Sequence, residues 1–291
     1  MTTTLPPLAN PLRRSRFAAP GGRREWFTIG SVIAASFYAV ACLVPFWIIV
    51  SSSLTDESLL NSQGFSFFPS PFSWKAYEII FGGSAFVLNA FLASVVITIV
   101  GTALALSATS GLAWVISRRE SRLSRPLAIM TYIPMLLTAG LVPFYILVTQ
   151  VLGLRNTWWA VILPFVVSPF LVFVQMQFFR EIPQAVIDSA RMDGAGPISM
   201  FFFIILPHLG RAISVVIMIE TIFLLSVFAE IYVTTSGGPG LASTNLAFLI
   251  YLKALREFDV GAASAGGMIA VVLANIVAIF LVRSIAKNIA D

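Results

Sequence analysis

The chain contains 291 residues, of which 58% are hydrophobic and 11% are charged, and its mean hydropathy is +0.92. Soluble domains carry about 25% charged residues, so this composition excludes an ordinary soluble protein and predicts an integral membrane protein. The net charge of +5 and the pI near 9.7 would also suit a nucleic-acid-binding protein, but the positions of the basic residues argue against a nucleic-acid partner.

The N-terminal part of the chain predicts one membrane helix between a basic leader and an outer loop. Residues 1–25 are rich in Pro, Arg, Gly and Ala, which indicates a disordered or interfacial leader on the cytoplasmic side. Residues 26–50 form an apolar run that is longer than the core of a signal peptide. The run is also long enough to cross a bilayer, which needs about 20 apolar residues. Residues 51–84 are polar and aromatic, as expected of a periplasmic loop with Trp74 and Tyr77 at the interface.

Five more apolar blocks predict a five-helix core over residues 85–283, and residues 284–291 form a cytoplasmic tail. The predicted spans cover residues 86–117, 127–148, 158–179, 211–233 and 261–282. The first block suits one long, tilted helix, and the alternative is two short spans broken near Gly111. Prolines in the next two blocks are tolerated where neighbouring helices satisfy the freed carbonyl groups. The predicted fold class is therefore all-α, a polytopic membrane bundle of six transmembrane helices.

The basic residues test this topology, because cytoplasmic loops of membrane proteins carry an excess of lysine and arginine. With six spans and a cytoplasmic N-terminus, 14 of the 18 basic residues fall on the inner side. The inner residues are Arg13, Arg14, Arg16, Arg23, Arg24, Arg118, Arg119, Arg122, Arg125, Arg180, Arg191, Arg211, Arg283 and Lys287. The outer side keeps Lys75, Arg155, Lys253 and Arg256. This asymmetry supports cytoplasmic termini and explains the high pI without nucleic acid.

Residues that could carry catalysis or bind a metal are scarce. The one cysteine, Cys42, lies in an apolar run, and the one histidine, His208, has no Cys/His cluster in the sequence, so a structural zinc site is not expected. The sequence has no G-x-x-x-x-G-K-[ST] pattern and therefore no P-loop. We expect no catalytic residue, no metal and no cofactor in this chain. If ATP drives the protein, another subunit must bind the ATP.

One polar stretch, residues 180–207, separates the fourth and fifth spans and is predicted to contain a short helix. Pro183 suits the first turn of a helix, because its missing N–H would have no partner there. Gly194 suits the position just past the end, where a left-handed residue closes the last turn. A helix of about three turns is marginal in water by itself. We therefore expect it to be docked across the cytoplasmic mouth of the membrane bundle.

The same stretch resembles the cytoplasmic loop of the permease subunits of bacterial binding-protein-dependent ABC importers. The motif of that loop is E-A-A, three residues, Gly, nine residues, Ile, one residue and Leu-Pro. Here Asp188-Ser189-Ala190 occupies the E-A-A position, and Gly194 follows after three residues. Nine more residues lead to Ile204, which precedes Leu206-Pro207 at the expected spacing. The departures are Asp for Glu and Ser for Ala. The alternative interpretation is an ordinary amphipathic loop between two membrane helices.

The resemblance implies a multi-pass protein of the bacterial inner membrane that acts within a larger assembly. Such permeases pair with a second permease subunit, bind two cytoplasmic ATP-binding subunits and receive substrate from a periplasmic solute-binding protein. The helix that couples to an ATP-binding subunit would cover residues 184–195. The implied coupling residues are Gln184, Ala185, Asp188, Ser189, Ala190, Arg191, Asp193, Gly194, Ala195, Leu206 and Pro207. Small side chains would allow close docking, while the aspartates would accept hydrogen bonds from the partner.

The resemblance also indicates a substrate class. After residue 25 the order of elements is similar to that of the maltose-type second permease of carbohydrate importers. The segments that look most like the sorbitol/mannitol members are residues 228–232, 237–240, 245–247, 258–261 and 270–277. The resemblance therefore implies a polyol or sugar substrate, moved through a protein that is surrounded by membrane lipid.

Three polar residues within or near the spans are candidates for the substrate pathway: Asn89, Glu220 and Glu230. Ionisable residues inside a membrane are costly and are often functional. Glu220 is the deeper glutamate, whereas Glu230 lies near an outer span end and can also be explained by access to water. Structural pairing inside the bundle is the alternative for both.

The alternative function is an ion-gradient-driven secondary transporter of a small neutral solute. Such transporters are often built from inverted repeats and broken helices, and no clear repeat relates the two halves of this sequence. A membrane-embedded enzyme is not favoured, because the sequence contains no Ser/His pair, metal cluster or paired intramembrane carboxylates with a nearby base.

Overall fold

A computed structural model describes residues 21–82, 85–118, 121–137 and 140–290 of the chain. Two compact units, residues 1–47 and 48–291, are distinguished and are described separately. The first unit contains most of helix α1 (Gly21–Ser53), which carries Pro45 in its interior. Most of the predicted leader, residues 1–25, lies outside the described residues.

The second unit is helical, and its described residues form no strand beyond an isolated bridge between Thr55 and Phe72. Its α-helices are α2 (Glu57–Gln63), α3 (Lys75–Phe81), α4 (Ala85–Ser117), α5 (Ser124–Leu136), α6 (Leu141–Ile146), α7 (Trp159–Ile162), α8 (Pro169–Glu181), α9 (Gln184–Met192), α10 (Pro197–Met200), α11 (Leu206–His208), α12 (Gly210–Leu225), α13 (Ala229–Thr234), α14 (Leu246–Tyr251) and α15 (Val260–Ala290). Between them lie the π-helical turns η1 (Leu147–Val151), η3 (Phe201–Ile205) and η4 (Leu252–Arg256) and the 3₁₀ turn η2 (Leu163–Phe165).

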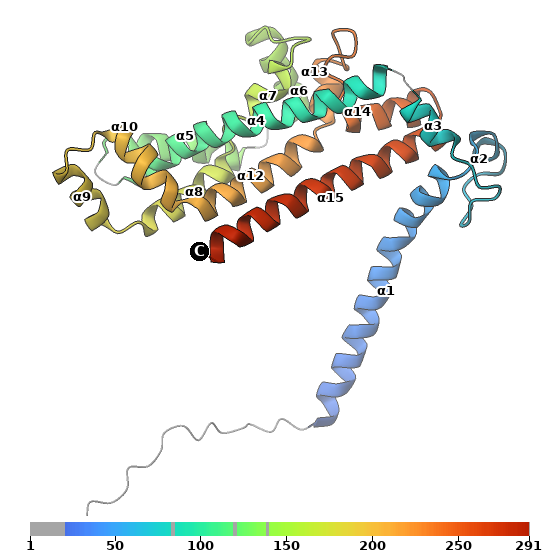
Figure 1. Cartoon of the computed structure of the whole chain (residues 1–291), viewed down its shortest axis with the longest axis horizontal. Helices are drawn as coiled ribbons and strands as arrows, with labels where there is room; N and C mark the ends of the chain where they lie inside the picture. The colour runs from blue at the N-terminus through green and yellow to red at the C-terminus, as the bar shows by residue number, and fades with distance from the viewer. Residues whose placement is uncertain (1–20, 83–84, 119–120, 138–139, 291) are drawn as a thin grey trace, which may run out of the picture. The chain divides into compact units, whose positions relative to one another are not determined.

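Helix α4 is the central element of this unit. It is continuous from Ala85 to Ser117, so the first apolar block of the core is one long helix and is not broken near Gly111. Helices α8 and α12 pack against it, and α15 packs against α12 and α14. Figure 1 shows α4, α12 and α15 running alongside one another. Gly101 allows the close contact of α4 with α12, because an added Cβ would lie 2.6 Å from Leu224 Cδ1.

Three described helices are long and apolar enough to cross a membrane, judged by length and composition. They cover Trp26–Ser53, Phe86–Ser117 and Val260–Arg283. A fourth crossing is obtained if the pair Trp159–Phe165 and Pro169–Glu181, bent by 42°, is counted as one span. The described residues thus contain fewer uninterrupted spans than the six predicted from hydropathy.

Helix breaks explain this difference. The predicted span at residues 127–148 is divided, because α5 ends at Leu136, Leu137 is extended, and Gly140 adopts a positive φ of 78°. The predicted span at residues 158–179 is broken between η2 and α8, where Pro169 begins the new helix. Proline removes a backbone N–H and favours helix starts, so an apolar run that contains it need not form one straight helix.

The predicted span at residues 211–233 is also divided, because α12 ends at Leu225 and α13 begins at Ala229. The fully buried Asn245 compensates for this break. Its side-chain Nδ2 donates a 2.5 Å hydrogen bond to the Val227 carbonyl, and its Oδ1 accepts one of 2.8 Å from the Phe248 N–H. One asparagine therefore satisfies a carbonyl in the break and caps α14.

Regular structure also extends into segments that were predicted to be loops. Helix α1 continues past Val50 to Ser53, and α2 and α3 lie within the predicted outer loop at residues 51–84. The segment between α13 and α15, also predicted as a loop, contains α14 and η4. Within these short helices, part of the backbone N–H and C=O groups of each segment form hydrogen bonds with one another.

A side chain from α2 caps the N-terminus of α15. The carboxylate of Glu57 accepts hydrogen bonds of 3.1 Å from the Val260 N–H and 2.6 Å from the Gly261 N–H. Gly261 leaves room for this approach, because an added Cβ would lie 2.9 Å from Glu57 Oε2. Asp259 Oδ1 accepts a third bond from the Ala262 N–H at 3.0 Å. Negative charge at a helix N-terminus interacts favourably with the helix dipole.

A Glu57→Gln variant is expected to lower the free energy of unfolding by about 1 kcal/mol, because it removes the charge and one acceptor from the start of α15. Thermal unfolding of the purified chain in detergent measures the effect. Glu78→Gln is the matched control, since Glu78 lies exposed on α3. Equal melting temperatures for the two variants would contradict a stabilising cap.

Candidate functional site

The polar stretch after α8 folds into the short helix α9. Pro183 is the residue before the helix, with ψ of 133°, so the prediction that it lies in the first turn was wrong by one position. Its ring prevents continuation of α8, because proline cannot donate a helical hydrogen bond. The helix ends at Met192 and is therefore shorter than the predicted range of residues 184–195.

Gly194 closes α9 as predicted from the sequence. Its φ is +81°, and its N–H donates a 3.1 Å hydrogen bond to the Arg191 carbonyl. The Ala195 N–H bonds the Ala190 carbonyl at 3.0 Å. This pair of bonds is the Schellman arrangement, which satisfies two carbonyls at the end of a helix. A left-handed residue is required there, and glycine adopts that conformation without steric strain.

The two sides of α9 differ in their surroundings. Ile187 and Ala190 are buried in an apolar cluster with residues of α4, α8, η3 and α12. Ala185, Ser189 and Met192 are exposed, and Met192 retains 83% of its accessible surface. Residues three or four positions apart share one side of a helix. Helix α9 is thus docked by one side and presents the other, made of small side chains and Met192, to the exterior.

The second half of the sequence motif lies beside α9. Ile205 in η3 is fully buried in the same apolar cluster as Ala190. Ile204 packs against that cluster, Leu206 is half-buried, and Pro207 is exposed. Figure 1 shows α9 and α10 together at one end of the unit, away from α2 and α3. The two halves of the motif therefore contribute to one apolar cluster.

The charged residues of α9 lie at the surface. Asp188 and Arg191 form an ion pair of 3.4 Å with exposed side chains, and Asp193 is exposed at the end of the helix. Exposed pairs contribute between about 0 and 1 kcal/mol, so this pair does not hold the helix in place. Gln184 is also exposed. These polar groups are accessible to a partner.

Of the three predicted pathway residues, Glu220 has the most enclosed position. It is 3% exposed on α12 and lines a cavity of 260 Å³ together with residues of η2 and the start of α8, including Ser168. Glu230 is half-buried in the first turn of α13, and Asn89 is exposed on α4. Neither of them lines the cavity at Glu220. The structure thus does not bring the three candidates into one described site.

Two further polar features within the bundle lie outside the three pathway candidates. Gln175 on α8 is 2% exposed and donates a 3.0 Å hydrogen bond to the Ser110 hydroxyl on α4, while its Oε1 is buried without a partner among the described residues. Thr98 and Thr102 lie on a second, largely apolar cavity of 430 Å³ between α4, α12 and α15. Their spacing of four residues places both threonines on one side of a helix, but this spacing is common in membrane helices and does not identify a site.

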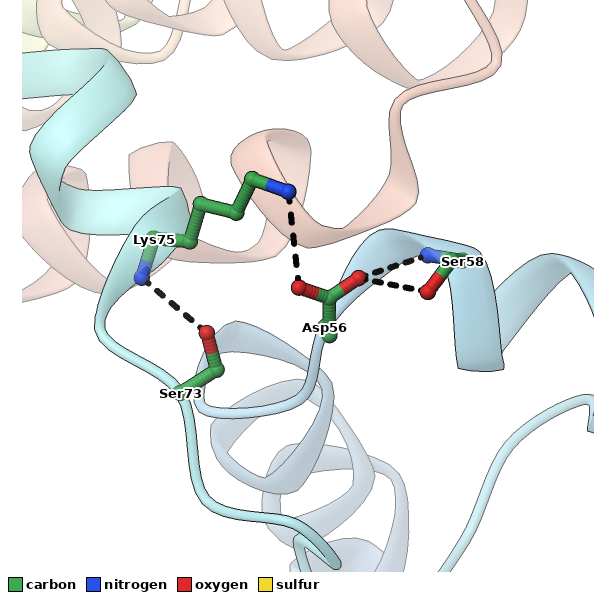
Figure 2. Close-up of polar contacts among 4 residues, drawn as sticks. All are labelled: Asp56, Ser58, Ser73 and Lys75. Carbon is green, nitrogen blue, oxygen red and sulfur yellow. Dashed lines mark hydrogen bonds and ion pairs between the residues drawn. The ribbon is translucent and has the colours of Figure 1, made fainter.

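A polar corner joins α2 and α3 at the other end of the unit. Figure 2 shows Asp56 accepting hydrogen bonds from the Ser58 hydroxyl and N–H at 2.7 and 3.0 Å, with Lys75 Nζ 3.5 Å from its second oxygen. The hydrogen bonds from Ser58, with the charge of Lys75, hold the pKa of the Asp56 carboxyl below its ordinary value. The Ser73 hydroxyl accepts from the Lys75 N–H at 3.3 Å. This corner orients both short helices.

No group of three or more His, Cys, Asp and Glu side chains that could hold a metal ion occurs within the described ranges of the chain. The polar residues described above form hydrogen bonds, cap helices or line cavities.

Comparisons with known proteins relate this helical membrane chain to a family of transport proteins. Residues 101–291 match the family model described as "Binding-protein-dependent transport system inner membrane component". The polygalacturonan/rhamnogalacturonan transport system permease protein YtcP of Bacillus subtilis (strain 168) is 33% identical over 170 residues, which cover 58% of this chain and 59% of that relative. The aligned part thus spans less than two thirds of the relative's length. Its name is that of a permease protein and not of an enzyme.

Two solved structures share the fold. A crystal structure of a bacterial ABC transporter involved in the import of the acidic polysaccharide alginate gives a TM-score of 0.78 at 17% identity, covering 91% of this chain and 98% of the matched chain. A structure of the bacterial alginate ABC transporter in complex with an alginate pentasaccharide-bound periplasmic protein gives 0.64 at 18% identity, covering 89% and 93%. At these identities the likeness extends to the fold alone.

Proposed function

Because the chain belongs to the family of binding-protein-dependent transport system inner membrane components, we propose that it is the membrane-spanning permease subunit of an ATP-driven sugar importer. The observation that carries the proposal is α9, a short helix docked by Ile187 and Ala190 and closed by Gly194. A helix held on one side and exposed on the other is suited to receive a partner and to transmit its movement to the bundle.

The proposed mechanism uses α9 as a rigid lever between this chain and a cytoplasmic ATP-binding subunit. Ala185 and Ser189 lie exposed and have small side chains, which allow close approach of the partner surface. Asp188 and Asp193 are placed to accept hydrogen bonds from the ATP-binding subunit. Movement of the docked helix would act on α4, α8 and α12 through the shared apolar cluster. ATP would be bound and hydrolysed by the partner subunits.

The assembly would contain a second permease chain, two ATP-binding subunits and a periplasmic solute-binding protein. The alginate transporter structure with a periplasmic protein supports the periplasmic partner by analogy of fold. We place α9 in the cytoplasm and the corner around Asp56 outside. Arg118, Arg180 and Arg191 lie at the α9 end, as the excess of basic residues on the cytoplasmic side requires. Both termini would then be cytoplasmic in a multi-pass inner-membrane protein.

The substrate proposed is a carbohydrate. The names of the relative and of the solved structures refer to polygalacturonan, rhamnogalacturonan and alginate, and they do not mention sorbitol or mannitol. The polyol hypothesis thus rests on the C-terminal segments of the sequence alone. Glu220, which is buried and lines a cavity, is the leading pathway candidate, and Asn89 and Glu230 remain further candidates. Hydroxyl-rich substrates are recognised by a few well-placed polar groups in such cavities.

An ion-gradient-driven secondary transporter is not favoured, because the family match includes α9 and the surrounding helices. The test is uptake by cells that carry this chain with its partner subunits and binding protein. Labelled galacturonan oligosaccharide, maltose, sorbitol and mannitol are offered with and without depletion of ATP. ATP-dependent uptake of one of these supports the importer and identifies its substrate class. Uptake by the purified chain alone, driven by an ion gradient in vesicles, would overturn the proposal.

A further inference from the structure

A pocket of 360 Å³ lies between α9 and the ends of α4 and α8. Three arginines from three different parts of the chain line it: Arg118, Arg180 and Arg191. Gln184 and Ser117 add neutral polar groups to the wall. No aspartate or glutamate occurs among the described residues that line the pocket. Three guanidinium groups around one open cavity, with no carboxylate among the described lining residues, favour an anion.

The positions of these arginines are defined by their neighbours. The Arg118 guanidinium lies 4.2 Å from the centre of the Trp114 ring, and its NH2 atom lies 3.6 Å from Met200 Sδ. Such stacking fixes the plane of the guanidinium group. Arg191 is paired at 3.4 Å with Asp188, which is 55% exposed and does not line the pocket. An exposed pair of this kind is weak and can exchange for a stronger anionic ligand.

The pocket lies on a different side of α9 from the surface proposed for the ATP-binding subunit. Gln184, Ile187 and Arg191 line the pocket and are spaced by three and four residues. Ala185, Ser189 and Met192 are spaced by four and three residues on the exposed side. A ligand in the pocket would therefore contact α9 at Gln184 and Arg191 and would leave Ala185, Ser189 and Met192 exposed.

We propose that this pocket binds a phosphate group at the cytoplasmic surface of the membrane. Arginine forms paired hydrogen bonds with phosphate oxygens, and basic pockets between membrane helices suit anionic lipid headgroups. The phosphate has two possible sources, the headgroup of an anionic phospholipid or free inorganic phosphate. Bound phosphate would tie α9 to the ends of α4 and α8. The inference goes beyond transport and relies on the proposed function only for the cytoplasmic placement of α9.

The test is binding by the purified full-length chain in detergent, which needs no transport activity. Native mass spectrometry compares retention of phosphatidylglycerol with that of phosphatidylcholine. The double variant Arg180→Gln and Arg191→Gln removes two pocket guanidinium groups and leaves Arg118 on its tryptophan. Arg122→Gln with Arg125→Gln removes the same charge from residues that do not line the pocket. Circular dichroism and the melting temperature check that both variants fold.

The wild-type chain and the control are expected to retain phosphatidylglycerol over phosphatidylcholine, and the pocket variant to lose this preference by about tenfold. Competition by millimolar inorganic phosphate, with weak lipid retention, would identify free phosphate as the source at the same site. Equal loss in both variants would show a general effect of charge and overturn the pocket. Unchanged retention in the pocket variant, with no binding of phosphate, would also overturn it. Transport failure with intact binding would instead count against the proposed function.

Discussion

A Gly194→Trp variant is expected to reach the membrane in normal amount and to lose most of its substrate uptake. Gly194 has a φ of +81°, and a residue with a Cβ costs about 1–2 kcal/mol in this left-handed conformation. No atom outside the adjacent backbone lies within 4 Å of a Cβ at this position, so the chain can still fold. The end of α9 would shift, and the indole ring would stand on its exposed side. A change of about 1.4 kcal/mol in coupling already corresponds to about tenfold in rate.

The measurement combines uptake with ATP hydrolysis in the assembled transporter. Loss of uptake with continued hydrolysis would show that α9 transmits the movement. Gly196→Trp is the matched control, because Gly196 has no positive φ and also has free space around a Cβ. Normal uptake by Gly194→Trp, or an equal loss in both variants, would remove the lever role of this helix end.

A Gly237→Ala variant is expected to be the most destabilising single-methyl change in the segment between α13 and α14. Gly237 has a φ of +85°, and an added Cβ would lie 2.5 Å from Thr244 Oγ1 and 2.9 Å from Phe248 Cε1. Left-handed strain adds about 1 kcal/mol, and overpacking adds about 1–3 kcal/mol. Phe248 is 2% exposed in an apolar cluster with Leu224 and Ile231, so its ring cannot move freely.

Gly240→Ala separates the two causes of this loss. Gly240 also has a positive φ, of +56°, but no neighbouring atom lies within 4 Å of a Cβ added at this residue. This variant is expected to lose only the backbone contribution of about 1 kcal/mol. Thermal unfolding of both purified variants in detergent measures the difference. Equal melting temperatures would show that Thr244 and Phe248 adjust without strain and that crowding at Gly237 is unimportant.

The helix at the candidate site could be predicted because its determinants are local. Pro183 prevents continuation of α8, and Gly194 supplies the left-handed conformation that ends α9. Both effects follow from the backbone of single residues. The motif spacing to Leu206-Pro207 could also be recognised from the sequence. The predicted start at residue 184 agrees with the structure, whereas Pro183 precedes the helix and the end lies three residues earlier than predicted, because capping residues and helical residues are difficult to separate without coordinates.

The breaks in the predicted spans could not be located from hydropathy. An apolar run has the same composition whether it forms one helix or two, and proline is compatible with both. The break after Leu225 is satisfied by Asn245, a residue 18 positions beyond the Val227 carbonyl that it bonds. Gln175 likewise meets Ser110 across 65 residues. Such pairs depend on how the helices pack, which one sequence does not specify.

The cap on α15 has a consequence for the order in which the protein is assembled. Glu57 and Val260, whose N–H it accepts, are separated by 203 residues. During synthesis the N-terminal part of a chain emerges first, so the carboxylate of α2 is present long before α15 is made. Helix α15 therefore completes its first turn on an acceptor provided by a much earlier segment. The contact between α2 and α15 thus forms only after α15 has been made, on a carboxylate that is already in place.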